Sequence, residues 1–219
     1  MGLNNRHARR MVFDLETAPL PEATDYLVPG IPPKHYKDPD VIRTWIAADR
    51  AEQLAKCSLD LDLCRIVALG WWLEGDPEPT CVVNQEPDGL RAFWPLVETG
   101  LTLVGYHCLS FDLPILQRRS LYLHVPQATL QVERWRHPRI VDLCQVLSYG
   151  GMVKMRSLEF YVRRFGFDLP DPLTGGDIAA AVEAEDWAAI AHHCVTDIRR
   201  TARLASRLGF FSTTTPPEA

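Results

Sequence analysis

The order of apolar runs along the chain constrains its fold more than any other feature. Several runs have the short apolar pattern of buried strands, at 11–13, 65–73, 80–83, 101–106 and 140–141. Segments of helical spacing lie between and after them, at 89–98, 111–121, 157–165, 176–184 and 186–208. A Gly-Asp-Pro turn at 75–77 joins two of the strands into a hairpin. Strands that alternate with helices in this way predict an α/β domain.

A proline-rich stretch interrupts this order between Pro19 and Asp60. Its prolines precede an apparent helix at 41–55, with Asp38 as the helix cap and Pro39 at the first position. We therefore expect an insertion or lid at 19–60. It would lie within a single domain over 11–208, because 219 residues can bury one core and no repeat or second boundary is found. The expected tails are 1–10 and 209–219, with disorder from 213 onward.

Composition excludes several classes of protein. The six cysteines form no C-x-x-C pair, so they indicate buried thiols of a reducing compartment rather than a zinc or redox motif. The sequence has neither a signal-peptide pattern nor a membrane-length apolar run, and we expect a cytoplasmic protein that does not enter a membrane. A net charge of −5 argues against a protein that coats nucleic acid. A nuclease stays open, because bound cations can mediate contact with phosphate.

Two acids, Asp14 and Glu16, follow the first apolar run. Functional groups of open α/β sheets gather at strand ends, so acids at the end of a core strand are candidates for a site. Residues two apart on a strand face the same side, and both carboxylates can reach one metal cluster. Alone, a D-x-E triplet is a weak signal, since a solvated strand end explains it equally well.

Two further acids stand at comparable places. Asp112 follows the strand pattern at 101–106 and lies near a helix start, where an ordinary first-turn acid is the alternative. Asp197 lies one helical turn after His193 on the last helix, so the two share a face. A hydrogen-bonded His–Asp pair without catalytic function is the alternative there.

The three elements together form a specific pattern. Phe-Asp-Leu-Glu-Thr at 13–17, Gly-Tyr-His-x-x-x-Phe-Asp at 105–112 and His-x-x-x-Asp at 193–197 resemble the three exonuclease motifs of the DEDD superfamily, the DnaQ-like 3′–5′ exonucleases. The middle of the chain is similar to predicted exonucleases related to the proofreading domain of family B DNA polymerases, through Pro33, Lys37-Asp38-Pro39, Leu59-Asp60 and Arg65-Ile66. The resemblance spans about 11–208. It implies a ribonuclease H-like mixed β-sheet flanked by α-helices.

The resemblance also implies a function. Asp14, Glu16, Asp112 and Asp197 would bind two Mg²⁺ or Mn²⁺ ions, because hard cations prefer carboxylate ligands. Two such ions can clamp the attacking and leaving oxygens of an in-line displacement. The substrate would be the 3′ end of a nucleic acid, with single-stranded DNA favoured over RNA, and the product nucleoside 5′-monophosphates. The alternatives are an RNA-directed nuclease with the same site and a catalytically inactive nucleic-acid-binding module.

A histidine would orient or deprotonate the attacking water, and two candidates are open. In the polymerase-related branch a Tyr stands four residues before the last Asp, the place of His193 here. In the proofreading-subunit branch a His stands five residues before it, the place of His192. Helical geometry favours His193, because four residues make about one turn.

Residues after the fourth strand would contact the substrate. These are His107, where related sequences usually carry Asn, and the aromatic residues Tyr106 and Phe111, which would stack on a terminal base. Four basic residues are candidates for phosphate contacts, although surface or core roles are favoured for them: Arg118, Arg119, Lys154 and Arg156. Asp142 matches an Asp-Leu pair of these relatives, but helix capping explains it equally well, so it stays outside the metal set.

Overall fold

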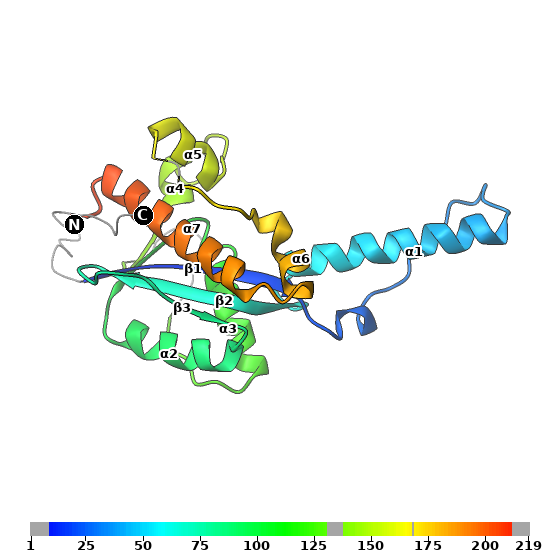
Figure 1. The fold of residues 1–219 in the computed structure, drawn as a ribbon, viewed down its shortest axis with the longest axis horizontal. Coiled ribbons are helices and arrows are strands. Elements are labelled where there is room, and N and C mark those ends of the chain that lie inside the picture. The colour runs from blue at the N-terminus through cyan, green and yellow to red at the C-terminus, as the bar shows by residue number, and fades with distance from the viewer. Residues whose placement is uncertain (1–8, 131–137, 168, 212–219) are drawn as a thin grey trace.

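The computed structural model describes residues 9–130, 138–167 and 169–211. Within them a five-stranded sheet runs in the order β3-β2-β1-β4-β5, so that the first strand is central (Figure 1). The strands are β1 (Arg10–Pro19), β2 (Cys64–Leu73), β3 (Thr80–Val83), β4 (Thr102–Gly105) and β5 (Ile140–Asp142). Of the predicted tails at 1–10 and 209–219, residues 1–8 and 212–219, including the disorder expected from 213, lie outside the described residues, whereas Arg10 already belongs to β1.

The sheet is mixed, as predicted. β1 pairs with β2 in antiparallel fashion along its length and with β4 in parallel, and β5 continues the parallel side. β2 and β3 form the predicted hairpin. Its turn contains Gly75 with φ 95°, a conformation that glycine adopts without steric cost.

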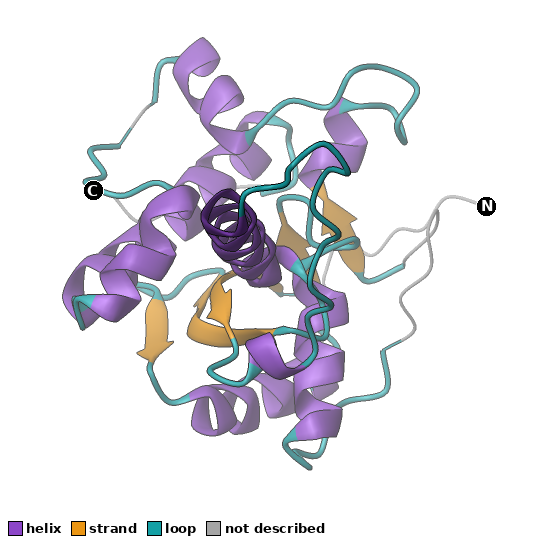
Figure 2. Ribbon diagram, turned by 90° about the vertical axis from the view of Figure 1, so that its right-hand side faces the viewer, coloured by secondary structure: helices purple, strands orange, loops and turns teal. Residues whose placement is uncertain are grey.

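Helices cover both faces of the sheet, as Figures 1 and 2 show. On one face lie α2 (Glu86–Glu98) and α3 (Asp112–Tyr122), whose apolar side chains join Phe13, Trp71 and Phe93 in one core cluster. On the other face lie α4 (Leu143–Leu147), α6 (Ile178–Glu183) and the long α7 (Trp187–Arg207), around Val12 and Trp72. The neighbouring residues 71 and 72 thus point to opposite faces, as alternation along a strand requires.

The first strand is longer than the sequence predicted. Asp14 and Glu16 lie inside β1 rather than at its end, because β2 keeps pairing with β1 as far as Pro19. The parallel partner β4 pairs only with residues 10–12. The two acids therefore lie beyond the carboxyl end of β4, at the edge where functional groups of parallel sheets gather.

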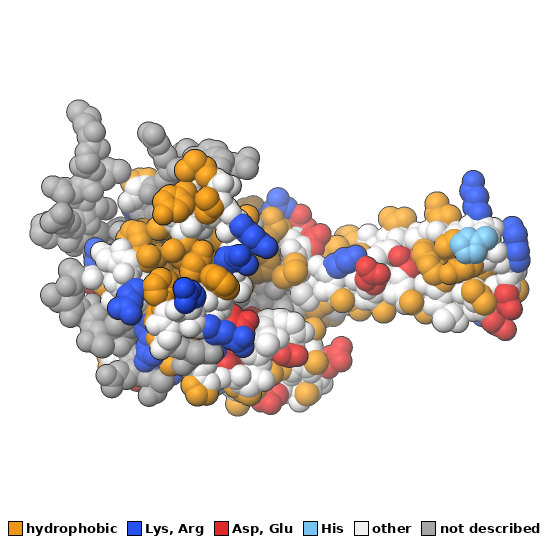
Figure 3. Space-filling view, turned by 90° about the horizontal axis from the view of Figure 1, so that it is seen from above, with side chains coloured by type: hydrophobic (Ala, Val, Ile, Leu, Met, Phe, Trp, Pro, Cys, Tyr) orange, Lys and Arg blue, Asp and Glu red, His pale blue; other side chains and the backbone are white. Residues whose placement is uncertain are grey.

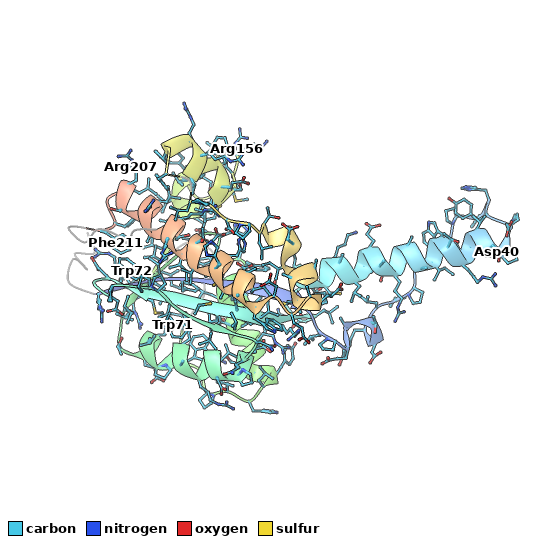
Figure 4. The ribbon with its side chains drawn as sticks, in the orientation of Figure 1. Asp40, Trp71, Trp72, Arg156, Arg207 and Phe211 are labelled. Atoms are coloured by element: carbon cyan, nitrogen blue, oxygen red, sulfur yellow. The ribbon has the colours of Figure 1, made fainter. Side chains whose placement is uncertain are left out.

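Other predicted boundaries needed small corrections. The helix expected at 89–98 begins at Glu86, and the segment expected to be helical at 176–184 is a 3-10 turn followed by α6. The short α4 was not predicted, because five residues are too few for a helical period to show. α5 (Leu158–Phe165) starts after its cap Ser157, close to the prediction. Phe211 packs its ring 5.7 Å from that of Trp72, far from Asp40 at the tip of α1 (Figure 4).

The stretch 19–60 forms an arm. Its helix α1 (Pro39–Lys56) has the predicted cap, with the Asp38 side chain accepting from the Asp40 N–H, and the predicted proline at its start. The preceding segment folds back along the helix, where the Gly30 N–H donates to Asp49 at 2.9 Å. α1, described over its whole length, buries none of its residues and points away from the sheet (Figures 1 and 2). No helix in the described residues is long and apolar enough to cross a membrane.

Candidate active site

Asp14 and Glu16 project from β1 toward α7. Val12 and Ala18 belong to the core cluster on the α7 face, so the even-numbered positions between them point the same way. Both acids remain paired to β2, Asp14 opposite Gly70 and Glu16 opposite Ala68. The register shifts directly after Glu16, an irregularity of the kind that often accompanies active sites.

Gly70 lets α7 approach the sheet closely. A Cβ on Gly70 would lie 2.6 Å from Cδ1 of Ile198 and 2.9 Å from Sγ of Cys194. The Cys194 thiol in turn lies 3.7 Å from the backbone oxygen of Asp14. A side chain at position 70 would push the helix outward, so glycine here determines how near His193 and Asp197 come to the acids of β1.

Asp112 reaches the same place from the turn after β4. It is the first residue of α3 and is buried, at 4% exposure. The turn is held by Asp142, whose carboxylate accepts from the backbone N–H groups of His107 (3.0 Å) and Leu109 (3.1 Å). The same carboxylate caps α4, accepting from the Cys144 N–H at 2.9 Å. Asp142 thus has the capping role considered from the sequence, and it also organises the turn that carries Asp112.

Burial raises the pKa of all four predicted metal ligands, and for Asp14 and Glu16 the charges of other acids in the set raise it further. Burial is the main cause that raises the pKa of Asp14, followed by the charges of Glu16, Asp112 and Asp197. Burial likewise raises the pKa of Glu16 and of Asp197. It raises the pKa of Asp112 to about 7, against an opposing effect of backbone hydrogen bonds. Carboxylates gathered in this way fit divalent cations, which would supply the missing positive charge.

His193 lies inside this group and His192 outside it. The His193 ring is buried, with Nε2 3.5 Å from Oε1 of Glu16. The His192 ring is exposed, and its Nε2 lies 3.4 Å from the backbone oxygen of Pro170. The helix thus turns His193, and not His192, toward the acids of β1.

Two residues of the site were not found from the sequence. Asp171 lies in the loop before α6 and places Oδ2 2.7 Å from Nδ1 of His193. Arg200 bridges the acids, with Nη1 3.1 Å from Oδ2 of Asp171 and 2.8 Å from Oδ1 of Asp197. Arg200 stands three residues after Asp197, so helical spacing was an available signal. Asp171 stands between two prolines in a loop, where no periodicity points to it.

Asp171, His193 and Asp197 also bring ligand atoms within 4.8 Å of one another, a spacing that could hold a metal ion. The Arg200 guanidinium already contacts the carboxylates of Asp171 and Asp197 and supplies positive charge to both. Around Asp14 of β1, in contrast, the charges of Glu16, Asp112 and Asp197 raise the pKa. The metal set predicted from the sequence shares only Asp197 with this cluster, so the four-acid set of Asp14, Glu16, Asp112 and Asp197 stays a prediction.

The three predicted substrate contacts differ in accessibility. His107 is exposed in a left-handed conformation, with φ 62°. Tyr106 is half-buried and donates its hydroxyl to the backbone oxygen of Arg156. Phe111 packs against the core cluster of α2 and α3. His107 lines one of two cavities beside the site, whereas Tyr106 and Phe111 line neither, so stacking by these two rings stays a prediction.

The four basic residues considered for phosphate contacts also differ in burial and in their partners. Arg119 is buried and forms two hydrogen bonds with Glu86, at 2.7 and 2.9 Å, so it is a structural residue and not a phosphate contact. Arg118 forms an ion pair with Asp62. Lys154 and Arg156 are exposed, in the segment before α5.

Two cavities lie beside the candidate site, and each is lined in part by the segment before α5. One, of about 620 Å³, has His193, Asp197 and Arg200 in its wall together with Ser157 and Arg163. The other, of about 730 Å³, is lined by residues of the turn after β4, of α3 and of the loop after α4, including His107, Arg118, Gly150 and Met155. The first cavity thus reaches Asp197 of the predicted metal set, and the second reaches the predicted substrate contact His107.

The fold defines the class of protein first. It is similar to a family B DNA polymerase from the hyperthermophilic archaeon Pyrobaculum calidifontis, with a TM-score of 0.60 over 92% of this chain and 18% sequence identity. The likeness covers 24% of the polymerase, so the chain spans about a quarter of that protein's length. At this identity the comparison shows the fold alone, the ribonuclease H-like mixed sheet that the sequence predicted.

The family follows from the sequence. Residues 59–214 match the model of a family described as a predicted 3′–5′ exonuclease related to the exonuclease domain of PolB, and the chain belongs to that family. No curated protein matches the chain. The match confirms the family that the motifs predicted, and it leaves the roles of individual site residues as predictions.

Proposed function

We propose that this protein is a metal-dependent 3′–5′ exonuclease that releases nucleoside 5′-monophosphates, with single-stranded DNA favoured over RNA. The observation that carries the proposal is the proximity of four acids: the charges of Glu16, Asp112 and Asp197 raise the pKa of Asp14, and those of Asp112 and Asp197 raise the pKa of Glu16. Buried like charges are costly unless cations bind between them. Membership of the exonuclease family supports the same function.

In this proposal the four carboxylates would hold two Mg²⁺ or Mn²⁺ ions. The ions would supply Lewis acidity for the attacking and leaving oxygens of the scissile phosphate. The acids come from β1, α3 and α7, three elements fixed by the core, so the ligand set is held in place before substrate binds.

His193 would orient the attacking water and accept its proton through Nε2. The ring nitrogen that faces Asp171 would carry the hydrogen, because a carboxylate at 2.7 Å accepts and cannot donate when ionised. Nε2 then faces Glu16 with a free lone pair. Asp171 would therefore be a positioning residue, which selects the tautomer and the direction of the ring, and Arg200 would hold Asp171.

The proposal is tested with oligonucleotides labelled at the 3′ or the 5′ end, single-stranded DNA and RNA in parallel, with Mg²⁺, Mn²⁺ or EDTA. We expect stepwise shortening from the 3′ end and release of 5′-monophosphates, with none in EDTA. Asp14→Ala should abolish cleavage, while Asp177→Asn, which alters a nearby exposed cap, should not. Cleavage that persists in EDTA or in Asp14→Ala would overturn the metal mechanism.

A further inference from the structure

An exposed apolar and aromatic surface covers α4, α5 and the loop between them. Tyr149 is 68% exposed and Met152 80% exposed in the loop, and Phe160 of α5 is exposed as well. Seen from above, apolar side chains gather over this region with Lys and Arg at their edges (Figure 3). Contiguous exposed apolar surface of this kind usually marks an interaction site. We refer to it as the α5 surface, formed by Tyr149, Met152, Lys154, Arg156, Phe160 and Arg164.

The α5 surface is positively charged on an acidic protein. Residues 145–165 contain four basic residues and one acid, whereas the whole chain has a net charge of −5. The Arg156 guanidinium lies over the Phe160 ring, 4.8 Å from its centre, on the α5 side of the molecule (Figure 4). Exposed rings among basic side chains suit a partner with both flat apolar groups and negative charges, such as unpaired bases on a phosphate backbone.

The backbone holds this loop in a defined shape. Tyr149, Gly150 and Gly151 all have positive φ, at 52°, 70° and 88°. The Gly150 N–H donates to the backbone oxygen of Gln145 at 2.8 Å, and the Val153 N–H donates to that of Ser148 at 3.1 Å. A non-glycine residue in the left-handed region is strained, and such strain is concentrated at functional positions. The turn presents the Tyr149 ring to solvent instead of burying it.

Two residues that neighbour the α5 surface in the chain, Met155 and Ser157, line the two cavities at the candidate active site. Met155, within the exposed loop, lines the cavity that contains His107. Ser157, the cap of α5, lines the cavity that contains His193 and Asp197. The Tyr106 hydroxyl bonds to the backbone oxygen of Arg156 and attaches the loop to the end of β4. A strand whose end lies at the carboxylates and leaves by either cavity meets this surface next.

We infer that the α5 surface binds the single-stranded part of a nucleic acid, with Tyr149 and Phe160 stacking on bases and Lys154, Arg156 and Arg164 contacting phosphates. The inference rests on the proposed function, which it extends by several nucleotides beyond the cleaved bond. Duplex nucleic acid does not fit, because its bases are already stacked on one another and cannot stack on these rings.

Binding is measured by fluorescence anisotropy with a 5′-fluorescein-labelled 20-nucleotide single strand of mixed sequence, in EDTA so that no hydrolysis occurs. Tyr149→Ala and Phe160→Ala should each raise the Kd about fivefold or more, given the usual strength of stacking between a base and an aromatic ring. The double variant Lys154→Ala, Arg156→Ala should weaken the dependence of log Kd on log salt by about 0.7 for each phosphate that is no longer neutralised.

Matched controls separate this surface from general charge effects. Arg43→Ala with Arg91→Ala removes the same charge from exposed positions of α1 and α2, and Tyr26→Ala removes an exposed ring of the arm. These variants should bind as the wild type does. Equally weakened binding in the controls, tighter binding of a duplex of the same length, or binding to anionic lipid vesicles but not to the oligonucleotide would overturn the inference.

A small substrate distinguishes failure of the inference from failure of the proposed function. Hydrolysis of thymidine 5′-monophosphate p-nitrophenyl ester with Mn²⁺ needs the metal site but not a strand. We expect the variants Tyr149→Ala and Phe160→Ala to hydrolyse it at the wild-type rate. If wild type and variants hydrolyse it and bind the strand equally well, the inference is wrong and the proposed function stands. If no variant or wild type hydrolyses it but the α5 variants bind the strand more weakly, the inference stands and the nuclease proposal is wrong.

Discussion

Nδ1 of His193 lies 2.7 Å from Oδ2 of Asp171, although the two residues are 22 positions apart on different elements. The carboxylate is itself held by Arg200 at 3.1 Å. The other nitrogen of the ring points to Glu16. This chain of contacts fixes a single orientation of the ring, with one nitrogen toward the protein and one toward the carboxylates. Because only His193 has these contacts, we expect different roles for His193 and its neighbour His192.

Substitution of these histidines should give opposite results. We expect His193→Ala to lower kcat by roughly 10²- to 10⁴-fold, the usual contribution of a general base. His192→Ala should leave kcat close to that of the wild type, because its exposed ring faces the Pro170 backbone oxygen and not the acids of β1. Steady-state kinetics on a labelled single strand at saturating Mn²⁺ measures both. Inactivity of His192→Ala alone would show that the histidine acts as in the proofreading-subunit pattern and would contradict the role proposed for His193.

Asp171→Asn should impair catalysis with little effect on substrate binding. The amide keeps the size of the side chain but lacks the charge that favours one tautomer of His193 and attracts Arg200. We expect kcat to fall roughly 10- to 100-fold, as for a misplaced catalytic group, with KM nearly unchanged. Asp171→Glu should recover less than the wild-type rate but more than Asp171→Ala. A change confined to KM would contradict the positioning role.

The sequence predicted the parts of the site that depend on local spacing. Asp14 and Glu16 share a face because they stand two apart on a strand, and His193 and Asp197 because they stand one turn apart on a helix. Asp171 could not be predicted in this way. Its contact with His193 exists only because α7 packs against the loop before α6, a tertiary arrangement with no signature in the spacing of the chain.

In the fold, too, the features set by neighbouring residues were predicted and those set by distant contacts were not. Caps and apolar periods predicted α1 and the β2–β3 hairpin closely, because both depend on neighbouring residues. The length of β1 was underestimated, since its second half, Thr17 to Pro19, is kept extended by pairing with residues 64–66 of β2. Pairing between strands some 50 residues apart overrides the polar and proline-containing sequence there.

The metal-free protein should become less stable as pH rises from about 4 to about 7. Burial raises the pKa of Asp112 to about 7 in the folded state, above its ordinary value of 3.8. Between these values the folded chain binds more protons than the unfolded chain, so the free energy of unfolding falls as pH increases. The decrease is on the order of 1 kcal/mol for each unit by which the pKa is raised.

Thermal unfolding in EDTA at several pH values measures this dependence, and Asp112→Asn should reduce it, the remainder coming from the raised pKa values of Asp14, Glu16 and Asp197. Asp62→Asn is the control, because hydrogen bonds from Tyr122 and then Arg118 lower the pKa of Asp62. That substitution should not remove the destabilisation at high pH. Saturating Mn²⁺ should remove it in the wild type, since the ions neutralise the carboxylates. A transition temperature that rises steadily with pH in EDTA would contradict the assignment.

Gly70→Ala should separate α7 from the sheet and reduce activity and stability together. The new Cβ would lie 2.6 Å from Cδ1 of Ile198 and 2.9 Å from Sγ of Cys194, too close for either atom to stay in place. We expect a decrease of about 1–3 kcal/mol in the free energy of unfolding, as for other overpacked cores. kcat should fall as well, because α7 carries His193 and Asp197.

Gly89→Ala is the matched control. Gly89 lies within α2, and a Cβ there would lie 3.6 Å from Leu69, an ordinary contact. Since alanine favours helix over glycine, that variant should be as stable as the wild type or more so, with unchanged kcat. Urea denaturation and single-turnover cleavage of a labelled strand measure the two effects, and a Gly70→Ala enzyme with wild-type kcat would show that the position of α7 does not limit catalysis.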